Sequence, residues 1–310
     1  MKSKELCIYL ERLRAARNIS QETFTLNVVS LRQYRRYING ESDIPFQVIH
    51  NLTAKLGVKT DNLLRELENV KVEETKLINK LYNLAVNLAH DEFVKLSREV
   101  PLEHIIEKSN QLLYQHSVIL DNLYQKKLTK FEAATQNAKL ISYPKILNQQ
   151  IMTSIEMLIL SSFLDVFDVT QHELIISKIK DFINDNSLVI SGGNEMMMSL
   201  VLARIAKYYG IKENYPAVLE YCNIGIQRNI QLKSYFLMDY FYYYSALVHY
   251  ELKNMEMYEK CVVECFNVLH FEDNADKIQK FTNLINEDFN IEFKDFVVSY
   301  YTKQMLKQSE

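Results

Sequence analysis

Residues 19–40 read ISQETFTLNVVSLRQYRRYING, and this stretch decides the fold of the N-terminal part of the chain. Ser20 and Ser30 each precede a short amphipathic segment, where a serine hydroxyl can cap the free N–H groups of a helix. Asn39-Gly40 is a strong turn signal and ends the second segment. The stretch therefore predicts two short helices joined by a turn.

The sequence on both sides completes a small helical domain. Leucines spaced three or four residues apart predict one helix before the quoted stretch. After it, Pro45 and Gly57 mark the two ends of a fourth helix, and Thr60 precedes a fifth. The charged segment 66–76 follows as either a loop or an exposed helix. We therefore expect a five-helix bundle over residues 1–68.

The composition of the whole chain indicates an all-α protein. Glycine and proline account for only 6 and 4 of 310 residues, where average usage would give about 12%. A β-rich fold needs these residues at its many turns, so it is excluded. Helical periodicity is nearly continuous from residue 77, and it predicts single helices over 77–97 and 145–167 and an interhelical turn at Gly192-Gly193.

Two C-terminal segments resemble each other, namely KYYGIKENYPAVLEYCNIGI (207–226) and HYELKNMEMYEKCVVECFNVL (249–269). Each ends one helix with aromatic residues and begins the next after a short polar turn. Their alignment makes Val218 equivalent to Cys261, a period of 43 residues. Such helix pairs are typical of tetratricopeptide-like (TPR-like) repeats, which stack into a superhelix. We expect these repeats within residues 69–310.

The sequence carries no signature of catalysis, cofactor binding or a metal centre. It has no P-loop, no G-x-S-x-G and no dinucleotide fingerprint, and its seven histidines never fall at the spacing of a metal pair. Cys261 and Cys265 lack a second pair of ligands, so we expect core thiols. Because these catalytic motifs are missing, we expect that the protein is not an enzyme. Because no segment matches a secretion signal or a membrane span, we expect it in the cytoplasm.

Residues 6–57 resemble the helix-turn-helix domain of the XRE/Cro family of bacterial and phage regulators. The matching residues, at the spacing of the family, are Cys7, Leu10, Leu13-Arg14, Ile19 to Glu22, Val29-Ser30, Tyr34, Tyr37, Gly40, Pro45, Leu52, Leu56 and Val58. Two positions depart from the family pattern: Ile38 replaces a glutamate, and Thr25 or Leu26 replaces an alanine. The resemblance implies binding to duplex DNA.

The chemistry of residues 30–38 agrees with this resemblance. Tyr34 and Tyr37 would pack inward, which turns three arginines outward with no acid among them. Residues 1–68 carry 11 basic against 8 acidic side chains, which suits a unit that meets a polyanion. In such domains the start of the recognition helix reads base edges, while neighbouring residues bind phosphates. The expected DNA-binding residues are Gln21, Ser30, Leu31, Arg32, Arg35 and Arg36.

The layout of the chain, a DNA-binding domain (1–68) followed by a helical-repeat domain (69–310), resembles the Rgg, PlcR and PrgX types of peptide-responsive regulators of Gram-positive bacteria. The resemblance implies a homodimer whose repeat domain binds a short signalling peptide. A twofold dimer would bind a palindromic operator. The peptide would then shift the two DNA-binding heads through the 66–76 link, and segment 291–307 would cap the repeats or join the dimer.

An extended peptide needs partners for its backbone amides and pockets for its side chains. The candidate peptide-binding residues are Asn194, Met198, Arg204, Tyr208, Asn223, Gln227, Tyr240 and Tyr244. Other roles stay open for some of them. The tyrosines also suit packing between repeats, Arg204 also suits an ion pair at the surface or within a repeat, and Met198 also suits the core.

Three functions remain compatible with the sequence. The first is a dimeric, sequence-specific transcription regulator gated by a short signalling peptide of the quorum-sensing type. The second is a phage or mobile-element repressor whose helical domain docks a protein partner. The third is a helical-repeat scaffold that does not bind DNA, and its support is the lost glutamate at Ile38.

Overall fold

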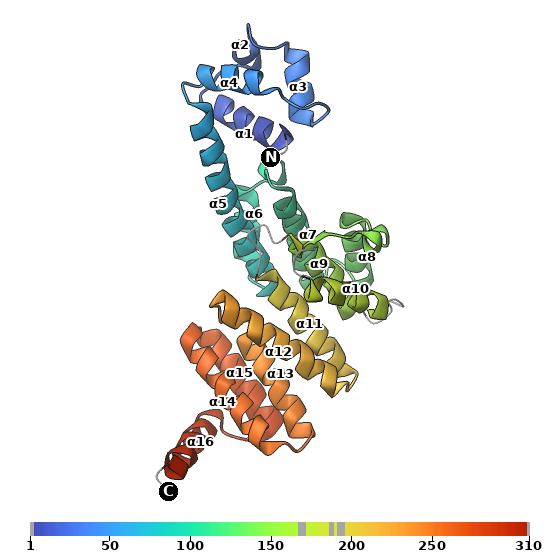
Figure 1. The fold of residues 1–310 in the computed structure, drawn as a ribbon, viewed down its shortest axis with the longest axis vertical. Coiled ribbons are helices and arrows are strands. Elements are labelled where there is room, and N and C mark those ends of the chain that lie inside the picture. The colour runs from blue at the N-terminus through green and yellow to red at the C-terminus, as the bar shows by residue number, and fades with distance from the viewer. Residues whose placement is uncertain (1–2, 167–171, 186–188, 191–195, 309–310) are drawn as a thin grey trace. The chain divides into compact units, whose positions relative to one another are not determined.

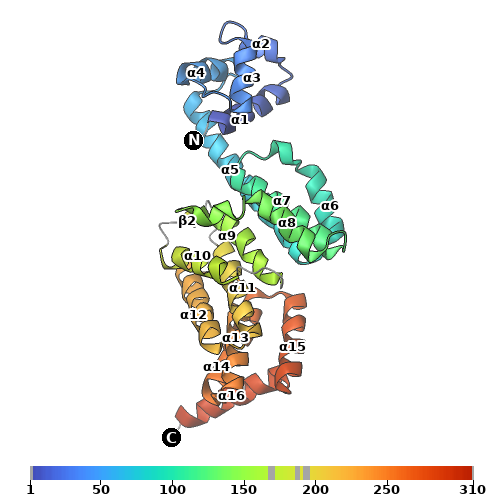
Figure 2. The ribbon, with the colours of Figure 1, turned by 90° about the vertical axis from the view of Figure 1, so that its right-hand side faces the viewer.

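The computed structural model describes residues 3–166, 172–185, 189–190 and 196–308, and it confirms the all-α fold. Within these residues the only strands are β1 (Met152–Thr153) and β2 (Val189–Ile190), which form a short parallel pair. The chain divides into two compact units, Met1–Leu140 and Ile141–Glu310. Figure 1 and Figure 2 show both units as helical bundles. The predicted turn at Gly192-Gly193 lies outside the described residues.

The N-terminal domain has the five predicted helices, and its short helices cluster at the start of α5 (Figure 1). They are α1 (Ser3–Ala16), α2 (Gln21–Thr25), α3 (Leu31–Asn39), α4 (Phe46–Lys55) and α5 (Thr60–Val86).

The predicted caps of α2 and α3 are present. The hydroxyl of Ser20 accepts the backbone N–H of Thr23 at 3.1 Å, and that of Ser30 accepts the N–H of Gln33 at 3.2 Å. Gly40 ends α3 with a φ of 77°, a left-handed conformation that costs glycine little. The local sequence therefore sets where the central helix pair begins and ends.

The charged segment 66–76 is helical, and it lies inside α5, which is 27 residues long. The predicted domain boundary at residue 68 thus falls within a continuous helix. Three further helices complete the first unit, namely α6 (His90–Glu99), α7 (Lys108–Tyr124) and α8 (Lys130–Leu140).

The prediction of one helix over 77–97 was wrong, because the chain turns between α5 and α6. Leu88 adopts a φ of 62° there, and the N–H of Ala89 bonds back to the carbonyl of Leu84. This is the hydrogen bonding of a helix C-terminus, in which glycine usually takes the left-handed position. Since a leucine takes it here, neither glycine nor proline marks the break in the sequence.

The single helix predicted over 145–167 is also wrong. The segment contains a 3₁₀ turn η2 (Lys145–Asn148), β1, α9 (Ser154–Ser161) and a second 3₁₀ turn η3 (Ser162–Asp165). Thr153 and Glu156 form a capping box at the start of α9, so the helix cannot extend back through them. The T-x-x-E spacing of these two residues was the signal that could have located this helix start.

The second unit continues with α10 (His172–Asn184) and six helices that pair in sequence order. These are α11 (Met197–Ile211), α12 (Tyr215–Leu232), α13 (Met238–Glu251), α14 (Met255–Glu272), α15 (Ala275–Phe289) and α16 (Phe293–Gln308). In Figure 2, α12, α13 and α14 lie close together, and helices α11 to α14 pack pairwise against their neighbours in sequence.

The repeat is real, but its period is 40 residues and not 43. Asn214 caps α12 through the N–H of Ala217, and Asn254 caps α14 through the N–H of Met257. The left-handed residues that end these two helices, Lys233 and Asp273, are also 40 residues apart. The predicted alignment matched aromatic and small residues, whereas the capping asparagines define the true register.

Gly225 permits close packing between α12 and α13. A Cβ atom added at this position would overlap the ring of Phe241, which is fully buried. By contrast, a Cβ added to Gly210 in α11 would come no closer than 3.9 Å to Val218. The two glycines are therefore required to different degrees, although both lie in helices.

We predict that Gly225→Ala lowers the free energy of unfolding by about 1–3 kcal/mol, because the Phe241 ring must move to admit the methyl group. The matched variant Gly210→Ala should raise it by about 0.5–1 kcal/mol, since alanine has the better helix propensity. Urea denaturation followed by circular dichroism measures both. Equal effects of the two substitutions would contradict the packing described here.

Candidate nucleic-acid interface and repeat surface

The outer face of α3 carries the three predicted arginines. Tyr34 and Tyr37 are buried in the domain core, as predicted, and this orientation leaves Arg32, Arg35 and Arg36 exposed. Ser30 is exposed at the start of the helix, and Leu31 is half-buried beside it. The structure thus presents a row of guanidinium groups on a short, well-capped helix.

The carboxylate of Glu11 in α1 ties the helix pair together. It accepts hydrogen bonds from Arg14 Nη2 at 2.7 Å, from Gln21 Nε2 at 2.6 Å and from the hydroxyl of Tyr34 at 2.8 Å. Burial raises the pKa of Glu11, but the hydrogen bonds from these three side chains outweigh it and lower the pKa below its ordinary value. A charged carboxylate therefore joins α1, α2 and α3.

Gln21 extends this network to the arginine face. Its amide nitrogen donates a hydrogen bond to Glu11, and its Oε1 accepts one from Arg35 Nε at 3.3 Å. Gln21 therefore holds one edge of the Arg35 guanidinium, and no further hydrogen bond or ion pair of Arg35 is found in the part of the chain that the structure describes. The terminal nitrogens of Arg35 remain free to bind an anion.

Ile38, the residue that departs from the family pattern, lies within the packed domain, and Glu11 supplies a carboxylate to the same bundle from α1. Arg14 pairs with Glu11 and donates a further hydrogen bond to the carbonyl of Ile19. Ile38 itself packs partly buried against the domain core.

The remaining two arginines differ in their partners. Arg36 Nε lies 3.5 Å from Glu41 Oε2, and its Nη1 donates to Gln33 at 3.3 Å. Such exposed ion pairs contribute about 0–1 kcal/mol to stability, so the Arg36 guanidinium can leave Glu41 for another anion at little cost. Among the residues that the structure describes, Arg32 makes no hydrogen bond or ion pair. Arg32 is therefore the arginine most available to an external partner.

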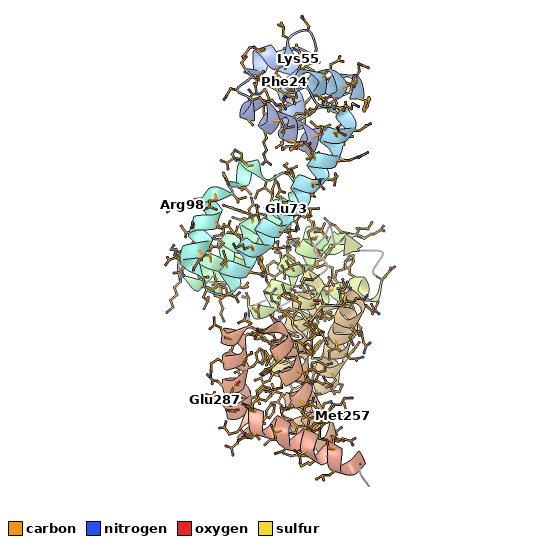
Figure 3. The ribbon with its side chains drawn as sticks, turned by 90° about the vertical axis from the view of Figure 1, so that its left-hand side faces the viewer. Phe24, Lys55, Glu73, Arg98, Met257 and Glu287 are labelled. Atoms are coloured by element: carbon orange, nitrogen blue, oxygen red, sulfur yellow. The ribbon has the colours of Figure 1, made fainter. Side chains whose placement is uncertain are left out.

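Lys55 braces the helix pair from α4. Its ammonium group donates to the carbonyls of Thr23 and Leu26 at the C-terminal end of α2, where a cation is favoured. Figure 3 labels Lys55 and the buried Phe24 of the same domain. The ring of Phe24 packs edge-on against that of Tyr34 at 5.8 Å, so α2, α3 and α4 share one core.

The predicted link 66–76 is packed into the first unit by two charged side chains. Glu74 is only 7% exposed, and it accepts the backbone N–H groups of Ile106 and Glu107 at 2.7 and 2.9 Å. The amide of Asn110 donates to the same carboxylate at 3.0 Å. One turn earlier, Lys71 pairs with Glu5 of α1 at 3.0 Å. Helix α5 is thus fixed to both α1 and α7.

The candidate peptide-binding residues on α11 are mostly buried or already bonded to other side chains of the same chain. Met198 and Tyr208 are buried, and the Tyr208 hydroxyl donates to Glu173 at 3.2 Å. Arg204 Nε lies 3.0 Å from Asp165, and its Nη1 donates to Ser161 at 3.0 Å. This is the ion pair that the sequence left open as an alternative. Asn194 lies outside the described residues.

The candidates on α12 and α13 fall into two groups. Tyr240 and Tyr244 lie one turn apart on one face of α13, where Lys280 donates to the Tyr240 hydroxyl at 2.8 Å. Asn223 instead lines a hollow together with Tyr242 and His249, which lie on the opposite face of α13 by helical periodicity. Gln227 is exposed on α12. The structure therefore does not gather all the predicted residues at one place.

The described part of the chain offers no site for a metal ion. No group of three or more His, Cys, Asp or Glu side chains comes together there. All four cysteines are buried, and burial raises the pKa of Cys261 to about 11, so this thiol stays protonated. None of the described helices is both long and apolar enough to cross a membrane.

Comparison with known proteins reveals similarity of structure but not of sequence. No protein-family profile matches the chain, and no curated protein matches its sequence. The structure of the regulator ComR from Streptococcus thermophilus in complex with DNA and its signalling peptide ComS matches with a TM-score of 0.53 at 14% identity, over 91% of this chain and 99% of that one.

Two structures of ComR from Streptococcus vestibularis match in the same way. The complex with the signalling peptide XIP gives a TM-score of 0.53 at 14% identity, over 93% of this chain and 99% of that one. The apo form gives 0.51 at 12% identity, over the same shares of the two chains. The chain therefore has the fold of these regulators, which confirms the predicted order of a helix-turn-helix domain followed by helical repeats.

We predict that Glu11→Ala lowers the free energy of unfolding by about 2–4 kcal/mol, because Arg14, Gln21 and Tyr34 lose a shared charged partner. The control Glu22→Ala, at an exposed site on α2, should change it by less than about 0.5 kcal/mol. Since folding lowers the pKa of Glu11, its contribution is complete at neutral pH and is lost as the pH falls through the folded pKa. The difference from wild type should accordingly shrink in acid. A difference in denaturation midpoint that is independent of pH would contradict a charged Glu11.

Proposed function

We propose that the chain is a sequence-specific DNA-binding transcription regulator of the cytoplasm, which acts as a homodimer and is gated by a short signalling peptide. The observation that carries this proposal is the exposed arginine face of α3, in a chain that has the fold of DNA- and peptide-binding ComR. Catalysis is no part of this role.

The recognition helix would enter the major groove with its N-terminal end. Arg32, which has no partner in the described structure, suits a bidentate bond to guanine, and Leu31 suits contact with a thymine methyl group. Arg35, held by Gln21, and Arg36, paired only weakly, suit phosphates. Ser30 and Gln21 complete the surface at the start of α3 and α2.

The peptide would lie on the repeat surface that carries Tyr240 and Tyr244. Two aromatic rings and the Lys280 ammonium group meet there, so the surface offers both apolar area and a hydrogen-bond donor. Arg204 would take part only by exchanging its bonds to Asp165 and Ser161. A peptide can shift DNA binding only if it binds two states of the dimer with different affinity.

The two alternative functions make different demands. A repressor released by a protein partner would use the same DNA surface but would not respond to short peptides. A scaffold without DNA binding rests on Ile38 alone, and Ile38 packs partly buried against the core of an intact helix-turn-helix domain.

We predict that Arg32→Ala weakens binding to the selected operator by about 1–3 kcal/mol and relaxes preference at one base position. Arg35→Ala should instead weaken binding to all duplexes alike and reduce the salt slope by about one. Arg98 is exposed on α6, as Figure 3 shows, and Arg98→Ala serves as the control with unchanged affinity. Fluorescence anisotropy at several salt concentrations measures all three. Equal losses for Arg32→Ala on specific and random duplexes would contradict its role in base recognition.

We predict that short hydrophobic synthetic peptides bind the full-length protein in calorimetry and change its affinity for the operator. The double substitution Tyr240→Ala, Tyr244→Ala should weaken this binding at least tenfold, because two ring contacts are lost. Tyr235→Ala, at an exposed tyrosine before α13, is the matched control. Operator binding that no peptide alters would favour the protein-docking alternative.

A further inference from the structure

A hollow of about 380 Å³ lies on the face of α13 opposite Tyr240 and Tyr244. Three helices form it, and each contributes side chains from successive turns. The lining residues are Leu219, Asn223 and Ile226 of α12, Tyr242, Ser245 and His249 of α13, and Met257, Lys260, Cys261 and Glu264 of α14. Figure 3 labels Met257 in this region. A hollow of this size fits a small molecule.

Its apolar lining comes from Leu219, Ile226 and Met257, which lie on two different helices. Lys260 and Glu264 also line the hollow, one helical turn apart and with opposite charges. These two charges offset each other, so the hollow does not select for a net charge. These walls suit a ligand with an uncharged, apolar body.

His249 supplies a directed hydrogen-bond donor. Its Nδ1 atom is buried and has no hydrogen-bond partner within the described residues, and burial lowers the pKa of the ring, so the imidazole is neutral. A proton on Nδ1 would be a buried, unsatisfied donor, which costs more than an unsatisfied lone pair. The favoured tautomer therefore carries its proton on Nε2.

Two further donors converge on the same hollow. Burial raises the pKa of Tyr242 to about 12, so its phenol is protonated, and its hydroxyl makes no hydrogen bond in the described part of the chain. Asn223 contributes an exposed side-chain amide from α12. Ser245 is different, because its hydroxyl already donates to the carbonyl of Phe241 at 2.8 Å. Nε2 of His249, the hydroxyl of Tyr242 and the amide nitrogen of Asn223 are thus free to donate to a ligand oxygen.

We propose that this hollow is a second ligand site, for a small uncharged molecule that joins an apolar body to a carbonyl oxygen, as in a ketone, ester or amide. The carbonyl accepts hydrogen bonds from His249 Nε2 and the Tyr242 hydroxyl, and the apolar body packs against Leu219, Ile226 and Met257. The site is separate from the surface of Tyr240 and Tyr244, and it does not depend on the proposed peptide or DNA binding.

The probe is acetophenone, compared with ethylbenzene, which has the same carbon skeleton without the oxygen. Full-length protein labelled with ¹³C in its methionine methyl groups is titrated with each compound by NMR. The Met257 signal is identified by its absence in Met257→Leu, and the buried Met152 serves as the reference signal.

We expect acetophenone to shift the Met257 methyl signal saturably and to leave the Met152 signal unmoved. Ethylbenzene should bind wild type about ten- to hundredfold more weakly, because it lacks the oxygen that accepts both hydrogen bonds. Tyr242→Phe and His249→Leu should each weaken acetophenone about three- to tenfold and leave ethylbenzene unchanged. The matched control Tyr235→Phe, at a tyrosine outside the hollow, should bind both compounds as wild type does. An unresponsive Met257, or equal binding of the two compounds, would overturn the proposal.

Discussion

The carboxylate of Glu11 is the interaction on which the proposed DNA-reading surface of α3 depends. Three side chains donate to it, from Arg14, Gln21 and Tyr34, and these donors lie on the three helices that build the recognition motif. Because Gln21 also holds Arg35, the position of an exposed guanidinium follows from a half-buried charge in another helix. Orientation of α3 and placement of its arginines are therefore parts of one hydrogen-bond network.

A second buried carboxylate sets the mechanical character of the first unit. Glu74 accepts hydrogen bonds from the N–H groups before α7, and Lys71 forms an ion pair with Glu5 of α1, so α5 runs from the helix-turn-helix domain into the next helices as one fixed element. Ile106, next to Glu107, also belongs to the core of the helix-turn-helix domain. Under the proposed function, a signal that moves α3 would have to move this whole body, since bending within 66–76 would break these bonds.

The parts of the structure that local chemistry determines could be predicted from the sequence. Ser20, Ser30 and Gly40 set the limits of α2 and α3 by hydrogen bonds over three to five residues, so those helices were predicted correctly. The break at Leu88 has no such signal. The repeat register depends on the capping residues Asn214 and Asn254, which the sequence does not distinguish from the other polar residues of the turns. Nor could the sequence show that Asn223 of α12 lies on the side of α13 opposite Tyr244. Tertiary packing sets how each helix is rotated about its own axis, and local sequence does not record it. The partners of Arg204 come from η3 and α9, about 40 residues away, and no local pattern joins them.

The central claim is that α3 reads duplex DNA while the rest of the chain pairs two copies and senses a ligand. A genome-wide footprint of the purified full-length protein, with and without culture supernatant as a source of peptide, tests it most directly. We predict a small set of palindromic sites, with half-sites about one or two helical turns apart, whose occupancy changes with the supernatant. Uniform binding to all fragments, or none that depends on salt, would contradict the claim.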